Sequence, residues 1–194
     1  MLLAKYIIFF SILIWLATPL RQYKKNYFFF FLLYALTDPI LILVHLFFHI
    51  HPYQAYSIFI LLAVLSLLKF TWIKKYKVYI SLAFLINIIL SVYANLKYLS
   101  IDLILLNFII LIIFLSKAIF DVYKEDLINV FYFVICVYQI SIIMKYVIFA
   151  TNVKTGIIFF YLTSAFEILI GIYFIFYNER NSPKIKFKLK SLEK

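Results

Sequence analysis

Seven long apolar stretches, separated by short polar segments, divide the chain. Each is close to the length of about 20 residues that an α-helix needs to cross a bilayer core of about 30 Å. The stretches cover residues 2–20, 27–49, 53–73, 78–96, 100–117, 127–149 and 156–177. Short connections make consecutive helices antiparallel neighbours. The pattern predicts an all-helical, up-down bundle of seven membrane spans over residues 1–178, followed by a basic tail over residues 179–194.

The boundary between the second and third stretches has no charged residue to mark it. Residues 27–68 contain no lysine, arginine or glutamate, yet they are far too long for one membrane-spanning helix. Proline disfavours helical geometry in the residue before it and is well tolerated in the first turn of a helix. We therefore predict a tight hairpin at His51-Pro52.

Composition and charge indicate that this bundle lies in a membrane. Of the 194 residues, 67% are hydrophobic and 14% are charged, whereas soluble domains are about 45–50% apolar and about 25% charged. Fifteen of the 19 lysine and arginine residues fall on one side of the predicted spans, and such residues favour the cytoplasmic side. The distribution predicts a multi-pass protein of an inner or plasma membrane, with its N-terminus outside and its C-terminus in the cytoplasm.

The tail has the alternating sequence KIKFKLK over residues 184–190. This pattern fits a short strand, an amphipathic segment or a contact with anionic lipids, which attract juxtamembrane lysines with roughly 1 kcal/mol each. A membrane-protein partner or a second copy of the chain is an alternative contact. Nucleic acid is not expected as a partner, because so short a tail offers no folded basic surface. The candidate contact residues are Lys184, Lys186, Lys188 and Lys190.

Five polar side chains fall near the middle of five different stretches. Ionisable residues inside a membrane face the interior of the helix bundle and often mark function. All five are therefore candidates to bind a ligand, an ion or a proton in a polar cavity, with the two acids as the charged groups. The alternative is a dry structural network of hydrogen bonds. The five residues are Asp38, Asn87, Asn107, Gln139 and Glu167.

One helical face of the second stretch carries Asp38, His45 and His49. Their separations of 7 and 4 residues place them within about 40° of one another at about 100° per residue. The two histidines also have a spacing that lets one helix supply two ligands to a metal ion, with His51 as a third candidate. The alternatives are histidines at the membrane surface with their tips in water, and a pH sensor.

Three further residues have expected structural roles. Gly171 in the last stretch would permit the close approach of another helix. Lys145 would either extend to the membrane surface or pair with an acid. Asp102 would cap the start of the fifth stretch.

The chain lacks the motifs of the common enzyme classes. There is no nucleotide-binding loop, nucleophile elbow, HExxH motif or haem-attachment motif, and no cofactor is implied. Because seven spans leave almost no mass outside the membrane, the leading hypothesis is a non-enzymatic, sensor-like or accessory subunit that acts through helix contacts. A small transporter or channel that uses Asp38 and Glu167 is the alternative. A metal-dependent membrane enzyme is the third hypothesis.

Overall fold

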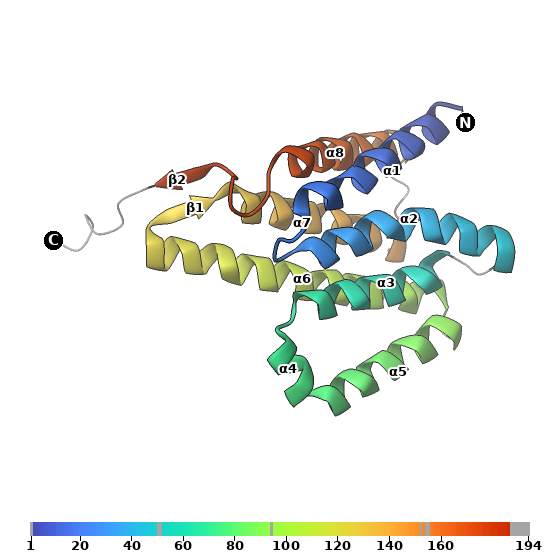
Figure 1. Cartoon of the computed structure of the whole chain (residues 1–194). Helices are drawn as coiled ribbons and strands as arrows, with labels where there is room; N and C mark the ends of the chain where they lie inside the picture. The colour runs from blue at the N-terminus through green and yellow to red at the C-terminus, as the bar shows by residue number, and fades with distance from the viewer. Residues whose placement is uncertain (1, 50–51, 94, 152, 154–155, 187–194) are drawn as a thin grey trace.

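The computed structural model of the chain describes residues 2–49, 52–93, 95–151, 153 and 156–186 (Figure 1). These residues form eight helices and two short strands, so the predicted all-helical class is confirmed. In chain order the elements are α1 (Leu2–Gln22), α2 (Phe28–Phe48), α3 (Pro52–Leu67), α4 (Phe70–Lys75), α5 (Lys77–Tyr93), α6 (Leu96–Glu125), β1 (Leu127–Asn129), α7 (Val130–Ala150), α8 (Gly156–Phe176) and β2 (Lys184–Lys186).

The third predicted stretch is divided between two helices. α3 ends at Leu67, and Lys69 adopts an extended backbone before the short helix α4. Basic residues recur at Lys74 and Lys75, at the end of α4. The chain thus leaves the helical path at residues 68 and 69 instead of continuing one helix through the predicted stretch.

The fifth predicted stretch, 100–117, extends in both directions into the 30-residue helix α6. At about 1.5 Å per residue this helix is about 45 Å long, which exceeds the thickness of a bilayer core. The polar segment after Lys117 therefore continues the helix, and α6 ends only where Asp126 adopts a left-handed conformation with φ of 50°.

The predicted hairpin between the second and third stretches lies between α2 and α3. α2 ends at Phe48, and His49 follows in a left-handed conformation with φ of 55°. Pro52 is the first residue of α3, the position that suits a residue without a backbone N–H. The rest of the turn, at residues 50 and 51, lies outside the described residues.

Three of the described helices are long and apolar enough to cross a membrane by length and composition. They are Phe28–Phe48, Lys97–Glu125 and Val130–Ala150, and shorter apolar helices cover Tyr6–Gln22, Gln54–Leu67, Lys77–Tyr93 and Tyr161–Phe176. Helices of this kind are typical of proteins that associate with membranes.

Six helices pack side by side in the order α8, α1, α2, α3, α6, α7. The pairing of α1 with α8 brings the first and last helices together, at the top of Figure 1. α5 lies outside this group and packs mainly against α3, while α7 and α8 touch over only a short length. The weak contact between α7 and α8 leaves space inside the bundle.

A fully buried aromatic cluster joins α2, α7 and α8. It consists of Phe31, Phe131 and Phe174, each 0% exposed. The ring centroids of Phe31 and Phe174 are 4.8 Å apart, and those of Phe131 and Phe174 are 5.5 Å apart. The cluster lies near the end of the bundle at which α1 and α8 end and α2 and α7 begin, which we call the basic end.

The expected close approach at Gly171 is confirmed, and its partner is α1. A Cβ atom added at Gly171 would lie 2.6 Å from Ile14 Cγ2 and 3.3 Å from Trp15 Nε1. Only glycine therefore allows α8 to pack at this distance from α1.

We expect Gly171→Ala to lower the free energy of unfolding by about 1–3 kcal/mol, the usual cost of overpacking. Ile14 is β-branched and in a helix is largely restricted to one χ1 rotamer, so its Cγ2 methyl cannot readily turn away from the new methyl group. Unfolding by a denaturing detergent, followed by circular dichroism, measures this loss. In an Ile14→Ala background the same change should cost less than about half as much, and an unchanged cost would contradict the assigned contact.

Candidate functional site

A cavity of about 510 Å³ lies among α1, α2, α3, α7 and α8. Asp38 from α2, Lys145 from α7 and Glu167 from α8 all line it. A neighbouring cavity of about 400 Å³ shares these three residues and extends along α2 to His45. The two acids predicted to share a polar layer are thus brought together, and we call the two spaces together the Asp38 cavity.

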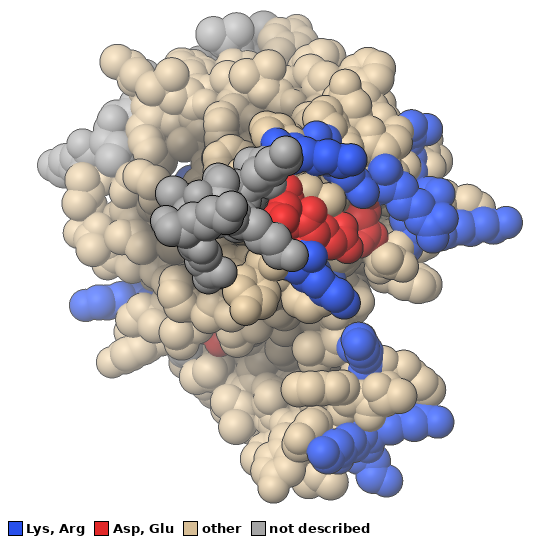
Figure 2. Space-filling model, turned by 90° about the vertical axis from the view of Figure 1, so that its left-hand side faces the viewer, with Lys and Arg blue, Asp and Glu red and all other residues tan. Residues whose placement is uncertain are grey.

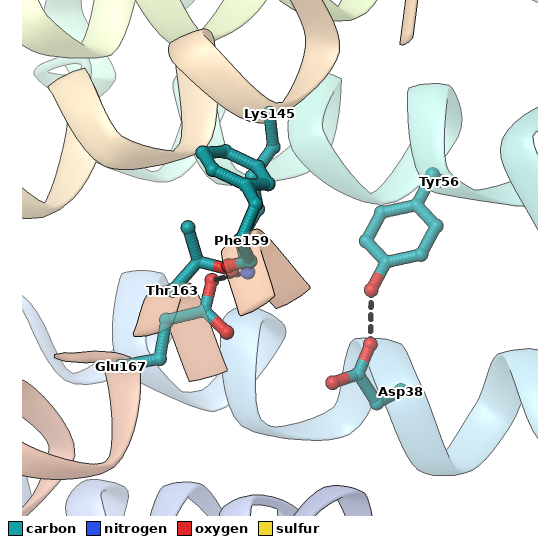
Figure 3. Close-up of polar contacts among 6 residues, drawn as sticks. All are labelled: Asp38, Tyr56, Lys145, Phe159, Thr163 and Glu167. Atoms are coloured by element: carbon teal, nitrogen blue, oxygen red, sulfur yellow. Dashed lines mark hydrogen bonds and ion pairs between the residues drawn. The ribbon is translucent and has the colours of Figure 1, made fainter. Parts of the chain in front are cut away.

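An ion pair crosses the Asp38 cavity where α7 and α8 are apart (Figure 3). Lys145 Nζ donates a hydrogen bond to Glu167 Oε1 over 2.5 Å. The two side chains are 30% and 20% exposed. Of the two roles expected for Lys145, pairing with an acid is the one observed.

Asp38 has a different kind of partner (Figure 3). The hydroxyl group of Tyr56, on α3, donates a hydrogen bond to Asp38 Oδ1. The Asp38 side chain is nevertheless exposed, and it lines both parts of the cavity. The carboxylate is therefore accessible to a ligand that enters the Asp38 cavity.

Aromatic rings from three helices form one wall of the Asp38 cavity. They belong to Trp15 on α1, Tyr34 on α2 and Tyr138 on α7. The ring of Trp15 stacks on that of Tyr138 with a centroid separation of 4.7 Å, and the Tyr34 centroid is 5.9 Å from that of Tyr138. The sequence contains no signal for this wall, because aromatic residues make up 22% of the chain and recur in every stretch.

Two members of the predicted polar layer form a packed network behind this wall. Tyr34 donates a hydrogen bond to Asn107 Oδ1 over 3.1 Å, and Gln139 Nε2 donates to the Tyr34 hydroxyl group over 3.1 Å. Asn107 and Gln139 are both 0% exposed and do not line the cavity. Their contact with the cavity passes through Tyr34, which lies between them and the open space.

The fifth member, Asn87, belongs to a separate cluster among α3, α5 and α6. Its Nδ2 atom donates to Ser57 Oγ over 2.6 Å and to Asp102 Oδ2 over 3.0 Å. The prediction that Asp102 caps α6 is therefore wrong. The cap is Asn95, whose side chain accepts a hydrogen bond from the Tyr98 backbone over 3.2 Å, because α6 begins earlier than the apolar pattern indicates.

The candidate metal ligands are separated by the end of α2. His45 lines the outer part of the Asp38 cavity, whereas His49 follows the helix in a left-handed conformation and leaves the helical face of Asp38 and His45. His51 lies outside the described residues. In the part of the chain that the structure describes, no three histidine, cysteine or acidic side chains cluster as metal ligands do. The metal site stays a prediction.

A chain of hydrogen bonds closes the basic end. Lys117 Nζ donates to the Tyr27 hydroxyl group over 2.5 Å, Tyr27 donates to Tyr132 over 3.3 Å, and Tyr132 donates to Glu179 Oε1 over 2.5 Å. This chain links α6, α2 and α7 to the segment after α8. Figure 2 shows lysine and arginine side chains around this end, with acidic side chains gathered between them.

The first part of the basic tail returns to the bundle as a strand. β2 pairs antiparallel with β1, so that Asn129 lies opposite Lys184 and Leu127 opposite Lys186. Of the forms expected for the tail, a short strand is observed over residues 184–186. Lys188 and Lys190 lie outside the described residues.

Comparison of the chain with models of protein families, with curated proteins and with solved structures finds no match. The chemistry of the Asp38 cavity is therefore the basis for a proposed function.

Proposed function

We propose that the protein has seven membrane spans, with its N-terminus outside and its C-terminus in the cytoplasm. α1, α2, α5, α6, α7 and α8 each provide one span, and α3 together with α4 provides the remaining one. Large apolar side chains point outward along these helices, among them Leu20, Val78 and Leu169, which are 79%, 69% and 65% exposed. Extended apolar surface of this kind suits lipid better than water. Lysine and arginine residues favour the cytoplasmic side of a membrane, which supports placing the basic end in the cytoplasm.

Within this membrane protein, we infer that the Asp38 cavity binds a small solute, a cation or a proton, and that the protein is a non-enzymatic transporter or channel. The observation that carries the proposal is that Asp38, Lys145 and Glu167 line one cavity although they come from three helices. Ionisable side chains inside a membrane are costly and are retained mainly where function needs them. Tyr34, Tyr56 and Tyr138 line the same space.

A cysteine in the cavity tests whether water reaches it. Cys136 is the only cysteine of the chain, so Cys136→Ala gives a thiol-free background. In this background, Thr163→Cys places a thiol in the cavity lining, and we expect it to react with a water-soluble, membrane-impermeant thiol reagent. Ser100→Cys is the matched control, because Ser100 is 0% exposed and lies outside the cavity. Equal reaction at both positions, or at neither, would contradict a water-accessible cavity.

Flux through reconstituted protein tests the use of the cavity. Proton movement into liposomes that contain the protein can be followed with a pH-sensitive dye. We expect Asp38→Asn and Glu167→Gln to reduce the rate at least tenfold, because each removes a carboxylate that the pathway needs. Asp102→Asn is the control, since Asp102 lies in the separate cluster with Ser57 and Asn87. A rate no higher than that of protein-free liposomes would rule out proton transport.

A sensor-like or accessory subunit is the second candidate. It is favoured by the buried cluster of Phe31, Phe131 and Phe174, which fills the bundle between the cavity and the basic end. A ligand in the Asp38 cavity would change the contacts among α2, α7 and α8 at this cluster. It would not need to pass through the bundle. Mass measurement of the intact particle, purified in a mild detergent, separates the two candidates. A strictly monomeric particle with no partner would argue against an accessory subunit.

A further inference from the structure

We propose that the Asp38 cavity takes a small organic cation, a protonated amine or a quaternary ammonium group on an apolar body. This assignment rests on the proposed function of the cavity and names the class of its ligand.

The charges of the lining favour a cation over an anion. Lys145 is in contact with Glu167, so these two charges compensate each other. Asp38 is instead in contact with the neutral hydroxyl group of Tyr56. With the three groups ionised and His45 neutral, the acidic and basic groups of the lining carry one net negative charge, at Asp38. Opposite charges attract more strongly beside the low-dielectric interior of a protein than in bulk water, which favours a cation at Asp38.

The aromatic wall favours an organic cation over a metal ion. The faces of aromatic rings attract ammonium groups that lie within about 6 Å of the ring centroid, and quaternary ammonium groups are typically held in cages of such rings. Trp15, Tyr34 and Tyr138 form this kind of wall, with centroid separations of 4.7, 5.9 and 6.4 Å. A hard metal ion needs several oxygen or nitrogen ligands close together, and the faces of these rings supply none.

The size and remaining lining of the cavity suit an apolar body. The larger part has a volume of about 510 Å³, within the range of about 300–1,000 Å³ that is typical of small-molecule sites. Ile60 and Ile142 lie in the same lining. An anionic ligand would have to displace Glu167 from Lys145, and no arginine lines either part of the cavity.

Trp15 provides a direct readout of binding. The chain has two tryptophans, and Trp72→Phe removes the one outside the cavity. In this background, the full chain in detergent micelles is titrated with three probes that share a phenyl ring: benzyltrimethylammonium, benzyl alcohol and benzoate. We expect the cation to change Trp15 fluorescence at a concentration at least tenfold below that needed for the other two probes.

Variants at two acids identify the group responsible. Asp38→Asn should weaken binding of benzyltrimethylammonium at least tenfold and leave benzyl alcohol unchanged. Asp102→Asn, outside the cavity, should change neither. Unchanged binding of benzyl alcohol in Asp38→Asn shows that the loss of cation binding reflects charge and not misfolding.

The possible outcomes separate this assignment from the proposed function. Equal binding of all three probes, or tighter binding of benzoate, would overturn the cation assignment while leaving a functional cavity. Unchanged cation binding in Asp38→Asn would overturn it as well. Failure of the thiol at position 163 to react with the water-soluble reagent would instead contradict the accessible cavity on which both proposals depend.

Discussion

Replacement of Lys145 by methionine is expected to lower the free energy of unfolding by about 2–3 kcal/mol. Methionine keeps most of the side-chain length but leaves the Glu167 carboxylate without its ammonium partner. Breaking a fully buried ion pair costs about 3–5 kcal/mol. The cost should be smaller here because the side chains of Lys145 and Glu167 are 30% and 20% exposed. Titration of the purified protein with a denaturing detergent, followed by circular dichroism, measures the change.

A double-mutant cycle distinguishes the ion pair from simple packing. The pair Lys145→Met and Glu167→Leu leaves no charge behind, so the double variant should be more stable than Lys145→Met alone. Residues in direct contact typically show coupling of about 0.5–3 kcal/mol, whereas independent sites add. If the two single effects simply add, the contact between Lys145 and Glu167 makes no energetic contribution.

The helices are predictable from sequence because each depends on a local pattern. A run of apolar residues that is long enough, as a helix, to cross a bilayer indicates a helix wherever it occurs. All seven predicted stretches contain a helix. The ends are less predictable. α6 continues through polar residues as far as Glu125, where it packs beside α7 and β1. Contacts with α7 and β1 stabilise this last part of α6, so the helix does not need apolar residues on every side there and extends beyond the apolar pattern.

The two acids of the site are predictable, but their surroundings are not. Asp38 and Glu167 are conspicuous as acids in apolar stretches. Their convergence depends on α1 packing against α8, and on the separation of α7 from α8, which no local pattern reveals. For the same reason Asn87, predicted to lie at a similar depth, belongs to a different cluster with Ser57. The depth of a residue follows from its position in a span, whereas its neighbours depend on the order in which the helices pack.

The aromatic cluster determines how far α2, α7 and α8 are free to separate. We expect Phe174→Ala to lower the free energy of unfolding by about 3–5 kcal/mol. Lipid is as apolar as the protein interior, so the loss comes from packing and not from transfer out of water. Truncation leaves about 100 Å³ unfilled, and at about 24 cal/mol per Å³ this costs about 2 kcal/mol. Each lost aromatic pair adds about 0.5–1.5 kcal/mol, and Phe174 contacts both Phe31 and Phe131.

Phe176→Ala is the matched control, because it makes the same change two residues further along α8. Its side chain is 64% exposed, whereas that of Phe174 is 0% exposed. Surface substitutions usually change stability by less than about 0.5 kcal/mol, so the two variants should differ by about 3 kcal/mol or more in the same detergent titration. Similar losses in both would mean that the end of α8 is stabilised by its contact with lipid or detergent, and that the aromatic cluster does not hold the three helices together.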